Sequence, residues 1–231
     1  MIVTGHQPNY LPWLGFFDKM RKSDVFIIED NIQFEYHGYT NRTRIKTSGG
    51  TRWLTVPIRG ARVTKPINEV HIANEVKNWA RNHWLNLKYN YCKAPYWNKY
   101  CNFFEETYSQ KWIKLIDLNM HFIRGLMGFF KITTPLVMAS SLGVSGEKSE
   151  LVLAQCKALG ADVFFSGIGA RSYLNVQHFN EKGINVVFQN FKHPVYSQHY
   201  GEFVKGLSAI DYLFYVGEKL YETDRTKAMG G

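Results

Sequence analysis

Apolar and polar positions in the first part of the chain predict a strand, a loop, a helix and a second strand. The apolar run at residues 1–4 predicts a buried strand, and residues 23–28 predict another. Between them, residues 14–20 carry apolar side chains at helical spacing, directly after a polar loop. In a parallel sheet, the loop after a strand lies at the carboxyl edge, where ligands bind. We therefore look for a functional site in residues 6–13.

The middle of the chain, from residue 74 to about residue 130, has the periodicity of helices. Aromatic and aliphatic side chains recur there at three- and four-residue spacing, and helix packing explains these stripes without a cofactor. Residues 43–47 and 53–58 instead flank a glycine-containing turn, which predicts a β-hairpin. The middle segment is therefore interpreted as a helical insertion that follows a hairpin.

The last part of the chain repeats the strand, helix, strand order. Strands are predicted at 133–138, 163–166 and 184–189, and a helix at 146–159. A glycine-rich turn at 166–174 follows the second of these strands, and such turns present backbone N–H groups to anions. The patterns together predict an α/β protein with a parallel, Rossmann-like sheet, a basic β-hairpin and a helical insertion. The expected organisation is one compact unit with the first half of the α/β core and the hairpin at 1–73, the helical insertion at 74–130, and the second half of the core with a C-terminal helix at 131–231.

Composition restricts the class of protein. The chain has 231 residues, of which 45% are hydrophobic and 16% aromatic, as expected for a globular protein. No apolar run reaches the roughly 18 residues of a membrane span, and the start of the chain lacks the features of a secretory signal. The cysteines at 92, 101 and 156 show no C-x-x-C spacing, so we expect reduced thiols, no metal site and a cytoplasmic location.

A formal net charge of +9 raises the possibility of an anionic partner. Residues 42–65 contain no Asp or Glu, and their alternation places Arg42, Arg44 and Lys46 on one face of the first hairpin strand. Two interpretations remain open for this basic patch. It is either a solvated hairpin surface or a cradle for a phosphate or diphosphate. The full patch consists of Arg42, Arg44, Lys46, Arg52, Arg59, Arg62 and Lys65.

Two histidines are candidates for catalysis, because the imidazole pKa lies near neutrality. His6 follows the first predicted strand among polar neighbours, whereas His193 precedes a proline in a C-terminal loop. A lone loop histidine is often only structural, and that alternative stays open for both. The candidate binding residues in the polar loops, besides the three basic residues of the hairpin, are Gln7, Asn9, Tyr10, Trp13, Gln33, Asn41, Ser166, Gly167, Gly169, Arg171, Tyr173 and Gln198.

The motifs of the chain resemble the WbqC-like family, whose bacterial members are encoded in surface-polysaccharide (O-antigen) gene clusters. The resemblance implies a protein that transfers glycine or another acyl group to an amino sugar. It rests on H-Q-P-x-Y-x-P-W at 6–13, D-x-x-Q-F at 30–34, N-R at 41–42, W-L-T-V-P at 53–57, G-A at 160–161, S-G at 166–167, Y-L at 173–174, H-P-x-Y-x-Q at 193–198 and L-S-x-I-D at 207–211.

A more distant similarity connects the chain to pantothenate synthetase and other nucleotidylyltransferases. Those enzymes have a loop with an H-x-G-H motif after the first strand and an N-P-x-Q-F motif after the second, and here Asn31 to Phe34 occupies the latter place. The similarity implies a nucleotidylyltransferase-type sheet and a pocket for ATP or another nucleotide. However, Tyr10 and Trp13 stand where the two catalytic histidines would be, so the pocket is better supported than adenylyl transfer.

Three functions are consistent with these observations. The first is a transferase that forms an amide on a nucleotide-linked amino sugar, with His6 or His193 as the base and the hairpin cations on the diphosphate. The second is a protein that binds a nucleotide or nucleotide sugar without catalysis. The third, motivated by charge alone and disfavoured because no binding motif is present, is a nucleic-acid binder. A homo-oligomer is compatible with each of them.

Overall fold

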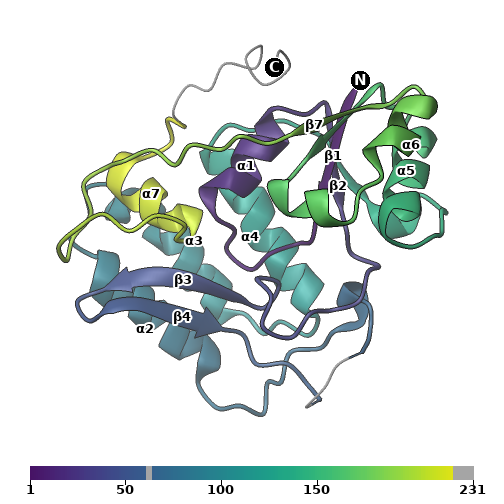
Figure 1. Cartoon of the computed structure of the whole chain (residues 1–231). Coiled ribbons are helices and arrows are strands. Elements are labelled where there is room, and N and C mark those ends of the chain that lie inside the picture. The colour runs from purple at the N-terminus through teal and green to yellow at the C-terminus, as the bar shows by residue number, and fades with distance from the viewer. Residues whose placement is uncertain (61–63, 221–231) are drawn as a thin grey trace.

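A five-stranded, all-parallel sheet with the strand order β5-β2-β1-β6-β7 forms the centre of the α/β part. Figure 1 shows β1, β2 and β7 of this sheet and, apart from them, the hairpin strands β3 and β4. The computed structural model describes residues 1–60 and 64–220. The strands of the sheet are β1 (Ile2–His6), β2 (Val25–Ile28), β5 (Leu136–Met138), β6 (Val163–Ser166) and β7 (Asn185–Phe188). A separate antiparallel hairpin consists of β3 (Arg42–Thr47) and β4 (Gly50–Thr55).

Helices cover both faces of the sheet. Phe26 and Ile28 of β2 join a core with α1 and the helical insertion, whereas Val3 and Ile27 pack on the opposite face against α5 and α6. Side chains alternate between the two faces because successive residues of a strand point in opposite directions. The α-helices are α1 (Leu14–Arg21), α2 (Trp79–Tyr91), α3 (Trp97–Ser109), α4 (Leu115–Phe129), α5 (Lys148–Ala158), α6 (Val176–Glu181) and α7 (Ala209–Val216), and the short 3-10 turns are η1 (Ile67–Glu69), η2 (Ala139–Ser141) and η3 (Ile168–Ser172).

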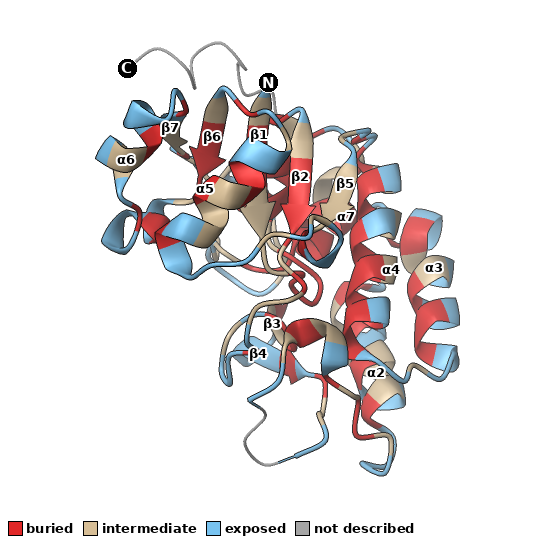
Figure 2. Ribbon diagram, turned by 90° about the vertical axis from the view of Figure 1, so that its right-hand side faces the viewer, coloured by how far each residue is buried: buried red, intermediate tan, exposed pale blue. Residues whose placement is uncertain are grey.

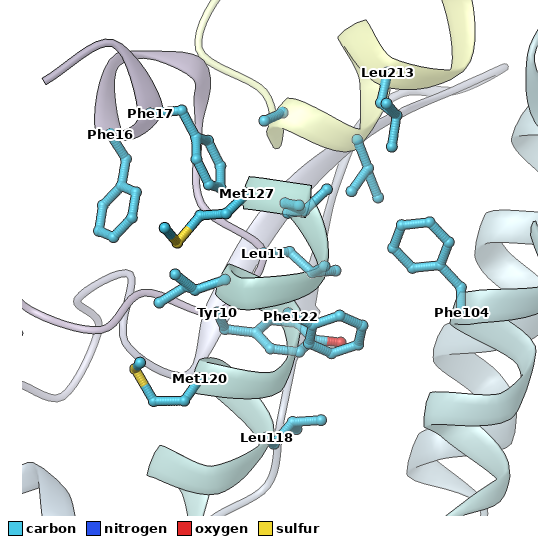
Figure 3. Close-up of a cluster of buried hydrophobic side chains, with 14 of the residues drawn as sticks. Tyr10, Leu11, Phe16, Phe17, Phe104, Leu118, Met120, Phe122, Met127 and Leu213 are labelled. Carbon is cyan, nitrogen blue, oxygen red and sulfur yellow. The ribbon is translucent and has the colours of Figure 1, made fainter. Parts of the chain in front are cut away.

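Helix α4 extends from the level of the sheet to the level of the hairpin, and most of its length is buried (Figure 2). The larger hydrophobic cluster draws on α1, the hairpin, the helical insertion and α7, so it includes residues from all three sequence segments. Tyr10 and Leu11, from the loop after β1, lie beside Phe122 of α4 in this cluster (Figure 3). The aromatic stripes of the middle segment thus contribute to the larger hydrophobic cluster.

The predicted fold class is confirmed, since the parallel sheet, the hairpin and the helical segments are all present. Some boundaries were wrong. The strand expected at 133–138 comprises only Leu136–Met138, and the helix expected from residue 146 begins at Lys148. Arg62 and residues 221–231 of the predicted third segment lie outside the described residues. In the described part of the chain, none of the helices combines the length and hydrophobicity needed to cross a bilayer.

Candidate functional site

A crevice of about 690 Å³ opens at the carboxyl ends of β1 and β6. These strands are neighbours in the sheet although 161 positions separate Ile2 from its partner Val163. The chain leaves β1 through α1 on one face and leaves β6 toward α6 on the other. This is the point where the strand order reverses, and loops that diverge at such a point leave a space in which open α/β sheets bind ligands.

His6 is the last residue of β1 and lines the crevice. Its Nδ1 lies 3.0 Å from the carbonyl oxygen of Gln7, and because a carbonyl only accepts, Nδ1 carries the proton. Nε2 is then the unprotonated nitrogen. Burial, with a smaller contribution from the charge of Lys19, lowers the pKa of His6 to about 3. The imidazole is therefore neutral at pH 7 when the crevice is empty.

Glu29 follows β2 and also lines the crevice. Gln155 of α5 donates from Nε2 to its Oε2 at 2.9 Å. Burial raises the pKa of Glu29, while that hydrogen bond and the nearby Lys19 act in the opposite direction. A side chain at position 5 would collide with the carboxylate, since a Cβ there would lie 2.7 Å from Glu29 Oε1. Gly5 therefore allows Glu29 to lie against β1.

Lys19 reaches the crevice from α1, although only 3% of the residue is exposed. Its Nζ donates to the carbonyl oxygen of Gly5 at 2.6 Å. Burial lowers the pKa of Lys19 to about 7, and the attraction of Glu29 partly opposes this shift. The crevice thus contains an amine that changes its charge near neutral pH, a neutral imidazole and a partly buried carboxyl group.

The side chain of Asn119, in α4, is hydrogen-bonded to the backbone of the loop that follows β1. Its Nδ2 donates to the carbonyl oxygens of Pro8 and Thr40, each at 2.7 Å. The hydroxyl of Thr40 in turn donates to Gln7 Oε1 at 3.0 Å. The helical insertion therefore sets the backbone that carries two residues of the crevice, Gln7 and Asn9.

Replacing Asn119 with alanine is expected to lower the free energy of unfolding by about 1 to 3 kcal/mol, because two buried carbonyl oxygens lose their donor. Denaturant unfolding followed by circular dichroism measures this change. Asn102→Ala, at an exposed position of α3, is the matched control and should change stability by less than about 0.5 kcal/mol. Equal effects of the two substitutions would show that Asn119 does not support the loop.

Seven of the site residues predicted from the sequence line the crevice. They come from two loops far apart in the sequence, one after β1 and one after β6, as the predicted order of elements suggested. These residues are His6, Gln7, Asn9, Ser166, Gly167, Gly169 and Tyr173.

Three other proposed residues take structural positions outside the crevice. Tyr10 is fully buried, with its hydroxyl 2.9 Å from His83 Nδ1 and hydrogen-bonded to Tyr108. Trp13 packs edge-on against Phe191, with ring centroids 5.1 Å apart. Asn41 donates from Nδ2 to the carbonyl oxygen of Val56 at 3.0 Å. The loop after β1 therefore divides its polar and aromatic residues between the crevice and the core.

The basic face of the hairpin makes contacts within the protein. Lys46 is 3% exposed and donates to Gln198 Oε1 at 3.3 Å, to Gly201 O at 3.4 Å and to Glu202 O. Arg44 Nη2 donates to the carbonyl oxygen of Gly206 at 3.3 Å. The first hairpin strand thus packs against the C-terminal segment, and Lys46 and Arg44 do not line the crevice.

Arg42 is the first residue of β3. It donates to the carbonyl oxygen of His37, and its guanidinium lies 4.2 Å from the centroid of the Trp53 ring. Arg42 does not line the crevice either. The expectation that Arg42, Arg44 and Lys46 share one strand face holds, but within the molecule that face meets protein groups.

The remaining proposed residues also lie apart from the crevice. His193 packs with Phe191 and Phe203 at centroid distances of 5.7 and 5.5 Å, and burial lowers its pKa. Gln198 donates to Asp211 Oδ1 at 2.7 Å. Arg171 lies over the Phe188 ring at 4.7 Å, and Gln33 is exposed beside Pro66.

Sequence reasoning missed two central residues of the crevice, Lys19 and Glu29. Glu29 had a usable signal, since a charged residue directly after a predicted strand lies at the binding edge of a parallel sheet. Lys19 had none, because a lysine in an amphipathic helix is normally a surface residue. Within residues 1–60 and 64–220, no group of three or more His, Cys, Asp or Glu side chains is arranged to hold a metal ion.

Comparison with known proteins identifies the family of the chain. Residues 7–223 match the model of the WbqC-like protein family. A protein of Mycobacterium tuberculosis named "Uncharacterized protein Rv1507c" is 32% identical over 214 residues, which cover 91% of this chain and 92% of that protein. No solved structure matches the chain significantly. The match over nearly the whole sequence shows that the chain belongs to the WbqC-like protein family.

Proposed function

We propose that the chain is a transferase that forms an amide, by adding a glycyl or other acyl group to a nucleotide-linked amino sugar in surface-polysaccharide (O-antigen) biosynthesis. The crevice at the reversal of strand order carries this proposal. Its lining includes the turn at Ser166 to Gly169, whose backbone N–H groups suit phosphate or carbonyl oxygens. Such a reaction would take place in the cytoplasm, with ATP or another nucleotide as a possible source of activation.

Amide formation requires that the attacking amine lose a proton. The amine nitrogen bonds to the acyl carbon, the bond from that carbon to its leaving group breaks, and a base accepts the proton. His6 is our candidate for the base because its Nε2 is unprotonated and borders the crevice. Negative charge on a bound ligand would favour the imidazolium form and so raise the pKa of His6 from its value in the empty crevice.

The second candidate is a protein that binds a nucleotide or nucleotide sugar without catalysis. The strongly lowered pKa of His6 favours it, because a base that holds a proton so weakly is poorly matched to neutral pH. Nucleic-acid binding is less favoured than the net charge alone suggests, since Arg44 and Lys46 of the basic patch contact carbonyl oxygens within the protein. The crevice is common to the two better-supported functions.

A product assay separates these candidates. The protein is incubated with a nucleotide-linked amino sugar, ATP and candidate acyl donors, and mass spectrometry detects the added acyl group on the sugar. Gly167→Leu should abolish both binding and product, because a side chain there projects toward Lys19, whose Nζ lies 3.9 Å from the position of a Cβ. Gly128→Leu is the matched control, since no atom lies within 4 Å of its Cβ position.

The outcomes have different meanings. Product with wild type and with Gly128→Leu, but not with Gly167→Leu, supports the transferase. A rise in melting temperature with the nucleotide sugar, without product from any donor, supports the binding protein. Neither product nor a thermal shift contradicts both candidates.

A further inference from the structure

The amine of Lys19 lies between the ends of the two central strands. Its Nζ contacts the carbonyl oxygen of Gly5 in β1 and faces Gly167, the residue that follows β6. The Phe26 ring lies behind it, with its centroid 5.9 Å from Nζ. Lys19 thus places the positive end of its side chain at the base of the crevice, where the strand order reverses.

The hydrogen bonding of this amine is incomplete. A lysine ammonium carries three N–H donors, whereas the described residues offer Lys19 one acceptor, the carbonyl oxygen of Gly5. The side chain is almost entirely buried, so bulk water compensates little for the missing partners. The open donor positions adjoin the crevice, and an anionic oxygen of a ligand there would complete the coordination.

We propose that Lys19 anchors the diphosphate of a nucleoside diphosphate group in the crevice. The proposal deepens the function proposed above, because it assigns the diphosphate of the nucleotide sugar to Lys19 in place of the hairpin. Lys46 and Arg44 of the hairpin are held by Gly201, Glu202 and Gly206, outside the crevice. Lys19 is the buried cation that faces the crevice in the described part of the chain.

Binding of a diphosphate should also cause Lys19 to take up a proton, because of the environment of its amine. Burial lowers the pKa of Lys19 to about 7, so the amine is only partly protonated near neutral pH. A diphosphate binds the ammonium form more tightly, and its negative charge raises the pKa of Lys19 in the complex. The contribution of Lys19 to the affinity therefore falls as the pH rises above 7.

Other ionisable groups also face the amine, and the experiment must distinguish them. His6 comes from β1 and Glu29 from the end of β2, while Tyr173 follows η3 and Lys148 begins α5. Glu35, which is exposed, also lines the crevice. Burial raises the pKa of Glu29 and lowers that of His6, so either group could also bind a proton with the ligand. Only the contribution of Lys19 disappears when Lys19 is replaced.

Isothermal titration calorimetry tests the proposal with inorganic pyrophosphate and uridine diphosphate as separate probes. Each titration is run at pH 7 in two buffers that differ in ionisation enthalpy, and again at pH 6 and 8. Wild type should take up more protons per bound probe at pH 7 than the Lys19 variants do, since burial lowers the pKa of Lys19 to about 7. Its affinity should fall by up to about tenfold between pH 7 and 8.

Two substitutions of Lys19 should differ in their affinity for the probes. Lys19→Met should lower affinity at least about tenfold, because the charged hydrogen bond is lost, and should lower the proton uptake by the contribution of Lys19. Lys19→Arg should retain binding with the same reduced proton uptake at pH 7, because arginine stays charged. Lys131→Met, at an exposed lysine paired with Glu218, is the control and should behave as wild type. Unchanged melting temperatures show that the variants are folded.

Three results would overturn the proposal: no binding of either probe to wild type at millimolar concentration, unchanged affinity in Lys19→Met, or proton uptake in Lys19→Met equal to that of wild type. Binding of pyrophosphate needs no acyl donor and no amino sugar. If proton-linked binding depends on Lys19 but no donor yields an amide, the anchor stands and the transferase proposal fails. If an amide forms and Lys19→Met binds both probes normally, the transferase stands and the anchor fails.

Discussion

His6→Ala is expected to lower the turnover of the proposed transferase at least about a hundredfold, the usual contribution of a general base. The large effect is expected because of the position of His6. His6 ends β1 at the crevice, and its Nδ1–H is fixed on the carbonyl oxygen of Gln7, so Nε2 is the nitrogen that can receive a proton from the substrate amine. Alanine removes that acceptor and leaves the strand unchanged.

Turnover is measured with saturating substrates, by mass spectrometry of the acylated sugar. His178→Ala is the matched control, because His178 lies on α6 near Glu150 and Glu181, outside the crevice, and its replacement should leave turnover within about twofold. His193→Ala tests the second histidine proposed from the sequence. A large loss with His193→Ala and none with His6→Ala would transfer the role of the base to His193.

Asp211→Ala is expected to lower the free energy of unfolding by about 3 kcal/mol or more. Asp211 is completely buried in the first turn of α7 and accepts hydrogen bonds from Tyr91, Tyr196 and Gln198 at 2.9, 2.7 and 2.7 Å. Burial raises the pKa of its carboxyl group, although these hydrogen bonds act against that shift. Alanine would leave the hydroxyls of Tyr91 and Tyr196 without an acceptor, would leave Gln198 Nε2 only the carbonyl oxygen of Val204, and would remove the negative charge near Lys46.

Denaturant unfolding of wild type and variant gives the change in free energy. Tyr196→Phe removes one donor and keeps the carboxyl group, so its cost should be smaller, about 1 kcal/mol. Because Gln198 links Asp211 to Lys46 of the hairpin, Asp211→Ala should also make the segment at 191–206 more sensitive to limited proteolysis. Equal stabilities of the two variants would show that the carboxyl group does not organise this network.

Much of the fold was predictable from local patterns. The apolar runs predicted the strands β1, β2, β6 and β7, because buried parallel strands read as continuous apolar segments. The three helices of the insertion followed from their aromatic spacing. Strand ends were less accurate, since β5 begins only after Thr133, Thr134 and Pro135 of the predicted strand and, at the edge of the sheet, is paired along one side only.

Tertiary packing decided the roles of the polar residues in the first loop. His6, Gln7 and Asn9 line the crevice, whereas Tyr10 enters the core beside α4. Both groups look alike in the sequence, because a tyrosine hydroxyl is equally suited to a ligand and to a buried partner such as His83. The difference depends on a helix that follows about one hundred residues later.

The sequence by itself determined the order of strands and helices, and with it the two loops that meet at the carboxyl edge of the sheet. His6 and Gly167 are candidates on the strength of that order alone, because each lies where a predicted strand ends. Only the tertiary structure showed that Lys19 and Glu29 line the same crevice. It also showed that the cations of the hairpin contact the C-terminal segment. The physical reason is that periodicity reports which face of an element is buried, whereas the partner of a buried charge comes from a different and distant element.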